Sequence, residues 1–461
     1  MRTLLITKSK IAAMTMTVLL SACTMEPTYQ RPVAPMASAF PTAAPSSAES
    51  KASEMPWHQF CRDERLNALV DLALTNNRDL QVAMLKVEQS RAQYRITRAG
   101  SLPNVDGSVG FARQNAQNVT TSQWNANAGV TGYELDLFGR LHSLNKQALE
   151  QYFATEETRN SARISLVAEV ATQYFSLRQV EEQLMVARET LSAVQQSFKL
   201  NKISFEAGQS NELDLRTAEG QVQSTMITIR GYELEQAQTT NALELLIGQS
   251  LPADLPASRQ LDADDVLAMI PVGLPADLLD RRPDILAAEH SLKSANANIG
   301  AARAAFFPSI SLTGSIGSAS TELSGLFGAG TGTWRFSPQL SIPIFSGGRN
   351  RANLDAAKIS TQIQVANYQK AIQTAFREVA DALAARSSYA EQIGLQSTAI
   401  IAQRRRLELA TLRYRQGEDS YLNVLLAQQD LQNAQQGLLR AQFNKLTSTI
   451  ALYKALGGGW R

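Results

Sequence analysis

The chain has little of what enzymes and redox proteins usually need. Its 461 residues include only two cysteines, Cys23 and Cys61, and three histidines, and neither type forms a metal-binding or redox spacing. Because no base is patterned with a nucleophile, the sequence offers no catalytic triad. The formal net charge is only +2, so composition does not favour nucleic acid or a strongly acidic partner. We expect neither an enzyme nor a cofactor.

Patterns that bind phosphate or soft metals are also missing. The glycine-rich run at residues 325–332 lacks the Lys-Ser/Thr pair of a P-loop, and it links two expected strands, so we interpret it as a loop. The methionines of the mature chain are scattered and form no soft-ligand cluster for Cu(I).

Long apolar runs are confined to the N-terminus. Residues 1–22 join basic residues, a short apolar stretch and small residues, which predicts a signal peptide too short to span a bilayer. This segment ends in Leu20-Ser21-Ala22-Cys23, which resembles a bacterial lipobox. The resemblance implies cleavage before Cys23, acylation there (palmitate), and, with Thr24 following, sorting to the outer membrane. Residues 23–62 are therefore expected to be a lipidated tether, rich in Pro, Ala and Ser.

Aromatic residues make up only 7% of the chain, and the rest of the composition favours long helices. Residues 141–204 contain no proline or glycine. Leu177, Leu184 and Leu191 recur every seven residues, as coiled-coil seams do. A helix of ~64 residues is ~95 Å long, whereas helices of globular proteins average ~12 residues. An ordinary helical bundle does not explain that length.

Four other segments alternate between apolar and polar residues with period two. They occupy residues 103–113, 124–138, 309–317 and 333–344, and they predict two β-hairpins. Strands of roughly ten residues cross a bilayer when tilted. Trp124, Tyr133, Trp334 and Phe336 are candidates for an aromatic girdle at the membrane surface, although buried packing would explain them as well.

The chain is a tandem duplication. Residues 63–248 predict a first repeat of helix, β-hairpin, long helix, turn and helix, and residues 283–461 predict a second. Residues 249–282 form an equatorial segment between them. Each repeat has a turn between two long helices, at Gly208 and at Gly417. Glycine supplies the left-handed position that ends one helix, and Ser or Asn caps the next.

Four strands cannot close a membrane barrel, because the smallest have about 8. An open edge in lipid leaves backbone groups unsatisfied. The strands are therefore soluble hairpins or shares of an oligomeric barrel, and the signal, anchor and long coiled coils favour the second. Three chains would supply a barrel of about 12 strands. The expected fold class is mainly α with a membrane β-barrel. The long coiled-coil helices of three chains would form an α-barrel, and the four strands of each chain would contribute to the β-barrel.

Several strings resemble the TolC-type outer-membrane efflux family, in the OprM/CusC-like (NodT-type) lipoprotein branch that serves resistance-nodulation-division pumps. They are residues 76–80, 133–140, 281–285, 295–308 and 455–460. The resemblance implies a homotrimer in outer-membrane lipid, with its helical part in the periplasm. It also implies two partners, a periplasmic membrane-fusion adaptor and an inner-membrane proton-driven pump.

In that family the two helix-turn-helix tips form the closed periplasmic entrance. The matching residues here are Gly208, Gln209, Ser210, Gly417, Glu418, Asp419 and Ser420. Asp419 falls where OprM-like channels carry an acidic ring, and three like charges at a constriction would attract cations. A solvated carboxylate at a helix N-cap is the alternative for Asp419.

We therefore predict an outer-membrane channel of a tripartite efflux pump. It would passively conduct drugs, toxic compounds or metal ions, and would open like an iris at its periplasmic tip. The alternatives are a TolC-like exit duct for type I secretion and a periplasm-spanning scaffold lipoprotein with no pore.

Overall fold

The computed structural model describes residues 24–37, 40, 56–257, 260–261, 266 and 277–458. The chain divides into two compact units. Unit 1 comprises residues 1–34, 85–157 and 286–370, and unit 2 comprises residues 35–84, 158–285 and 371–461. Cys23 and the predicted signal peptide at residues 1–22 lie outside the described residues, as do parts of the predicted tether and equatorial segments.

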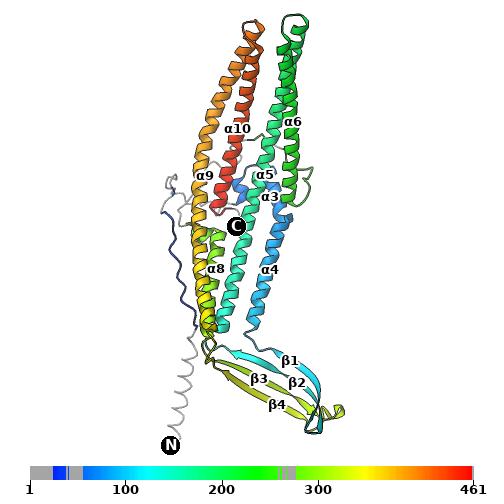
Figure 1. Cartoon of the computed structure of the whole chain (residues 1–461), viewed down its shortest axis with the longest axis vertical. Helices are drawn as coiled ribbons and strands as arrows, with labels where there is room; N and C mark the ends of the chain where they lie inside the picture. Colours follow the sequence, from blue (N-terminus) through cyan, green and yellow to red (C-terminus); the bar gives the residue numbers. More distant parts are fainter. Residues whose placement is uncertain are drawn as a thin grey trace. The chain divides into compact units, whose positions relative to one another are not determined.

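The helices follow the predicted order (Figure 1). They are α2 (Trp57–Phe60), α3 (Glu64–Asn76), α4 (Arg78–Ala99), α5 (Arg140–Glu206), α6 (Glu212–Ile247), α7 (Leu278–Arg281), α8 (Pro283–Ala304), α9 (Arg349–Arg415) and α10 (Tyr421–Ala455). The helices α5 and α9 have 67 residues each and contribute to both units. The predicted long helices are confirmed.

The first helical region is divided at Asn77, which ends α3 in an extended conformation. Its side-chain oxygen accepts the backbone N–H of Leu80 at 2.9 Å and so caps α4. The second repeat is divided in the same place, at Arg282 between α7 and α8. Arg282 is buried and pairs with Asp284 at 2.6 Å and with Glu378 at 2.7 Å. These two breaks explain why the matching strings around Asn77 and Arg282 contain polar residues.

The heptad seam lies in unit 2, between helices. Val180, Ala187 and Val194 are almost completely buried, as the seven-residue step predicts. Leu184 and Ala187 of α5 pack with Ile229 of α6 in one core cluster. The α5–α6 pair is therefore held by the seam read from the sequence.

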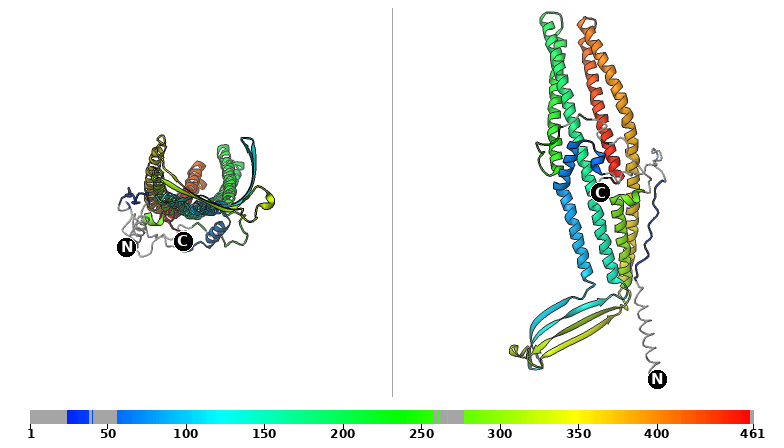
Figure 2. Two further views of the ribbon diagram at one scale, coloured as in Figure 1. Left: turned by 90° about the horizontal axis from the view of Figure 1, so that it is seen from below. Right: turned by 180° about the vertical axis from the view of Figure 1, so that it is seen from behind.

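Unit 1 carries one antiparallel sheet with the order β1-β2-β3-β4 (Figure 2). Its strands are β1 (Val105–Ala116), β2 (Val119–Leu135), β3 (Ser309–Ser320) and β4 (Gly332–Ser341). The four predicted strands are confirmed. The middle pair, β2 and β3, joins the hairpin of one repeat to that of the other. The sheet is curved and open, with β1 and β4 as its free edges.

Among the described residues, no helix is both long enough and apolar enough to cross a membrane.

Candidate functional site

The sheet has one apolar face. Cross-strand partners in an antiparallel sheet share a face, so the register identifies its members. Phe111 pairs with Trp124, and Ile316 pairs with Ala128 on one side and Trp334 on the other. The same face carries Val105, Val109, Ala126, Val130, Tyr133, Leu135, Ile310, Leu312, Phe336, Pro338 and Leu340. All four girdle candidates therefore lie on this face.

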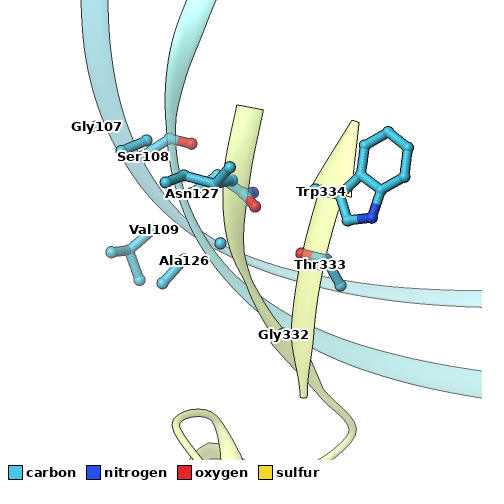
Figure 3. A pocket seen from close by; sticks show the side chains of 11 residues that line it. Gly107, Ser108, Val109, Ala126, Asn127, Gly332, Thr333 and Trp334 are labelled. Carbon is cyan, nitrogen blue, oxygen red and sulfur yellow. The ribbon is translucent and has the colours of Figure 1, made fainter. Parts of the chain in front are cut away.

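The apolar face is exposed in the single chain. Trp334 is 78% exposed and Phe336 is 65% exposed, so packing within this chain does not explain them. Figure 3 shows the indole of Trp334 standing away from β4, beside a shallow open hollow that Val109 and Ala126 also line. A contiguous exposed apolar surface of this kind needs a lipid or protein cover.

A β-bulge keeps β2 in phase with this face. The pairing with β3 shifts between Val130 and Tyr133, and Gly132 within the bulge has a φ of 65°. In a regular strand without a bulge, Tyr133 and Leu135 would point to the opposite face, because they lie an odd number of residues after Val130 and side chains alternate along a strand. The bulge thus extends the apolar face to the helix-proximal end of β2.

The opposite face of the sheet carries mostly small and polar side chains. Asp106, Ser108, Asn125, Asn127, Ser311, Thr313, Ser315, Ser337 and Gln339 lie on it by register. Gly317 lies there too, where a Cβ would come within 2.2 Å of the Ala126 carbonyl oxygen, so only glycine fits. One apolar and one polar face are what a membrane barrel with a wet interior requires.

The two predicted tips are turns of identical backbone design in unit 2, at the same end of that unit (Figure 1). Gly208 and Gly417 both have a φ of 72°. The amide of the residue after each glycine bonds back to the carbonyl five residues earlier, at 2.8 Å for Gln209 and 3.0 Å for Glu418. This is the Schellman motif, so the sequence-based prediction of left-handed glycine caps is confirmed.

Asp419 does not occupy the N-cap position of α10. The N-cap residue is Ser420, and the N-cap alternative for Asp419 is wrong by one residue because Ser420 is itself extended. The Asp419 carboxylate accepts hydrogen bonds from the Ser420 backbone N–H at 2.9 Å and from the Asn423 side chain at 2.5 Å. Arg413 lies 3.7 Å away. The hydrogen bonds from Asn423 and Ser420, with the charge of Arg413, lower the pKa of Asp419.

The two hairpins contact each other close to their tips. The Tyr414 hydroxyl of α9 donates to the Asn201 side-chain oxygen of α5 at 2.5 Å. Tyr421 and Val424 of α10 pack with Ala218 of α6 in one buried cluster. Burial and the nearby charge of Asp214 raise the pKa of Tyr414, so its hydroxyl stays protonated and able to donate. We name this contact, from Asn201, Ala218, Tyr414, Tyr421 and Val424, the tip clasp.

Sequence reasoning identified the turns but missed the clasp. Asn201 and Tyr414 are separated by 213 positions, and no local pattern links them. One signal was present, since the position of Tyr414 in the second repeat corresponds to Phe205 in the first. A tyrosine in place of a phenylalanine adds a hydroxyl that needs a partner when buried. Cys23 lies outside the described residues, so its acylation stays a prediction.

No group of three or more His, Cys, Asp or Glu residues that could hold a metal ion occurs in the described ranges.

An open sheet with a lipid-type face and long paired helices is the architecture of outer-membrane efflux proteins. A family model described as "Outer membrane efflux protein" matches residues 69–249 and again residues 274–458. The chain belongs to this family, and the double match confirms the internal duplication. The family is one of channels and not of enzymes.

Named relatives match this chain over nearly their whole length. The solvent efflux pump outer membrane protein SrpC of Pseudomonas putida is 47% identical, over 98% of this chain and 99% of the relative. The cation efflux system protein CusC of Escherichia coli is 42% identical, over 96% and 97%. The open-state MtrE outer membrane channel of Neisseria gonorrhoeae has a TM-score of 0.89 at 40% identity, covering 95% of this chain and 99% of that one.

These findings confirm the predicted fold class, in which the strands of each chain contribute to a trimeric barrel. They also confirm the predicted function and location. The chain is a subunit of an outer-membrane efflux channel that conducts passively, with its helical part in the periplasm.

Proposed function

We propose that three copies of this chain form an exit duct whose periplasmic entrance is closed by the two tips of each chain. The entrance opens like an iris when a periplasmic adaptor docks and an inner-membrane resistance-nodulation-division pump delivers cargo. The observation that carries this proposal is the tip clasp. It joins the α5–α6 hairpin to the α9–α10 hairpin through one tyrosine hydroxyl and one small buried cluster.

A clasp of that size suits a gate. A net hydrogen bond contributes about 1 kcal/mol, and a docking adaptor can supply several times that amount. The turn residues Gly208, Gln209, Ser210, Gly417, Glu418, Asp419 and Ser420 form the rim of the entrance in this proposal. Asp419 contributes as an anion held in place by Asn423 and Arg413.

The cargo is best described as toxic small molecules or metal ions, because close relatives differ. SrpC is described as a solvent efflux protein and CusC as a cation efflux protein, at similar identities. Acylation of Cys23 adds a lipid anchor, and no further cofactor is proposed. A susceptibility panel on a deletion strain, with drugs and solvents set against copper and silver salts, separates the two cargo classes.

Conductance in planar bilayers tests the gate. We expect the purified wild-type trimer to rest at low conductance and Tyr414→Phe to raise it, because the hydroxyl that bonds to Asn201 is lost. The matched control is Tyr232→Phe, which removes the hydroxyl that accepts the Gln436 amide on the same helix pairs but outside the clasp. No conductance from either protein, or from tip variants, would indicate a scaffold without a pore. Equal increases in both variants would contradict a gate at the tip.

A further inference from the structure

The start of the described chain is held firmly against α8. We name residues 24–31 the N-terminal strap. The strap is extended and belongs, like most of α8, to unit 1. Figure 1 shows it in dark blue, running along the helices.

Its partners on α8 form a single stripe. They are Glu289, Lys293, Asn296, Gly300 and Arg303, at steps of three and four residues, which places them on one helix face. Arg303 donates to the Met25 carbonyl oxygen at 3.1 Å. Asn296 donates to the Pro27 carbonyl oxygen at 2.8 Å. The strap therefore runs antiparallel to the helix and meets it through its backbone at two places.

Glu289 receives the other end of the strap. Arg31 pairs with it at 2.6 Å, and the Tyr29 hydroxyl donates to it at 3.2 Å. Lys293 adds a second cation at 3.1 Å and also lies 5.4 Å from the centre of the Tyr29 ring. The Glu289 side chain is only 6% exposed, so losing the strap would leave a buried carboxylate with one cation fewer. Burial by itself raises the pKa of Glu289, but the hydrogen bonds and charges of Arg31 and Lys293 outweigh it and keep the pKa below its ordinary value.

Glu26 ties the strap to a second helix. Its side chain, 7% exposed, pairs with Lys146 of α5 at 2.9 Å. A Cβ on Gly300 would lie 3.0 Å from the Glu26 backbone and 2.5 Å from the Ser143 hydroxyl. Glycine at position 300 is therefore what lets the strap approach α8. Docking of the strap thus gives a structural role to Asn296, Gly300 and Arg303, three residues of the string at 295–308.

Strap and stripe match in length. Fourteen residue steps of helix, from Glu289 to Arg303, rise about 21 Å. Six extended steps, from Met25 to Arg31, span about 20 Å. The two lengths agree, so an extended strap can reach all of these partners on α8 at once. Met25 lies at the end of α8 from which the chain enters β3 at Ser309.

We propose that the N-terminal strap is a built-in spacer. By docking on the α8 stripe it sets the height of the chain end relative to the first residues of the membrane strands. Cys23 is two residues before Met25, and two residues reach at most about 7 Å. An acyl group there would be held level with the strand ends, where it anchors the sheet as well as the chain. This role rests on the acylation within the proposed function, whereas the docking does not.

Docking is tested with a nitroxide label at Thr28→Cys, an exposed strap position. We expect slow label motion in the full-length protein and at least a tenfold larger mobile fraction after Glu289→Gln. The control is Glu150→Gln, because Glu150 pairs with the neighbouring His290 at 2.7 Å in the same unit. A label that is equally mobile in all three proteins overturns the docking.

The spacer role is tested with two identical eight-residue Gly-Ser insertions. One, between Thr24 and Met25, frees the chain end from the docked strap. The other, between Ala34 and Pro35, leaves that distance unchanged. We expect the first to reduce folded trimers in the outer membrane at least fivefold, and the second to leave them near the wild-type level.

Equal trimer levels for the two insertions overturn the spacer role. Failure of the proposed function is distinguishable, because a wild-type protein that forms membrane trimers but conducts nothing contradicts the channel and not the strap.

Discussion

The two tips of this chain share a backbone and differ in almost every side chain. Gly208 and Gly417 have the same φ and the same pair of return hydrogen bonds. The first tip caps α6 with Asn211, whose side-chain oxygen accepts the Asp214 N–H at 2.8 Å. The second tip has Ser420 at that position, without a side-chain cap bond.

The second tip instead carries aromatic and ionic contacts. Tyr421, 1% exposed, takes the place of the exposed Glu212, and Asp419 takes the place of Ser210. Asp419 faces Arg413, where the first repeat has Ser204. After duplication, the turn backbone was retained because few residues tolerate a positive φ, and the side chains were free to diverge. The clasp draws its tyrosines from the second repeat only, so we expect the second hairpin to dominate gating.

The largest difference in stability between the two tips is expected when the residue after each N-cap is truncated to alanine. Tyr421→Ala removes a buried aromatic ring and should cost about 3–5 kcal/mol. Glu212→Ala removes an exposed side chain and should change stability by less than about 0.5 kcal/mol. Thermal unfolding of the detergent-solubilised protein, followed by circular dichroism, measures both. Similar losses would mean that the hairpins are equally buried at their tips.

Valine at either turn glycine should affect the two tips alike. Gly208→Val and Gly417→Val each force a branched residue into the left-handed region, at about 1–2 kcal/mol. Gly394→Val is the control and should cost less, because a Cβ added there, in the middle of α9, would meet no atom from outside its own helix turn within 4 Å. The same thermal measurement applies. A large asymmetry between the two turns would contradict their shared backbone.

Removing the N-cap side chains should destabilise the first tip more than the second, the reverse of the order expected for Tyr421→Ala and Glu212→Ala. Asn211→Ala loses a cap bond and should cost about 1 kcal/mol. Ser420→Ala should cost little, because Ser420 makes no side-chain cap bond. Hydrogen exchange of the first turn of α6 and of α10 resolves the two effects. Equal deprotection of both helices would argue against the cap assignment.

The smallest effect is the pH response of Asp419. Its pKa is lowered in the folded chain, so its stabilising contribution is complete above the ordinary value of 3.8 and is lost as pH falls through the lower folded value. Resting conductance should therefore stay flat from about pH 7 to 5 and rise only in stronger acid. Asp419→Asn should remove that acid step. A rise already near pH 6 would indicate a crowded acidic ring, in which like charges raise the pKa.

The sequence predicted the features that depend on residues close together along the chain. The heptads of α5, the glycine turns and the alternating strands all follow from spacings of a few residues. The pairing of β2 with β3 was not predicted, because local alternation does not say which strands meet. The strap was expected to be an extended tether, and its docking was missed for the same reason. Glu289 is 258 positions from Arg31, and its burial is invisible in a polar helix sequence.

The bulge at Gly132 was also missed. Its consequence, that Val130 and Tyr133 share a face although three positions apart, is contrary to strict alternation. The bulge therefore weakens the alternation of β2 in the sequence, although the folded face carries most of the large apolar side chains of the sheet. For α10 the predicted serine does lie at the N-cap, although its side chain makes no cap bond, and only the alternative that placed Asp419 there is wrong.

The open edges of the sheet bear on how the channel is made. Strands β1 and β4 each leave one side of their backbone unpaired in the single chain. In a bilayer each unsatisfied group costs several kcal/mol. A lone chain is therefore excluded from the membrane, and insertion becomes a cooperative event whose rate rises steeply with the concentration of free subunits. A subunit that has not met its partners therefore does not perforate the membrane as a partial pore.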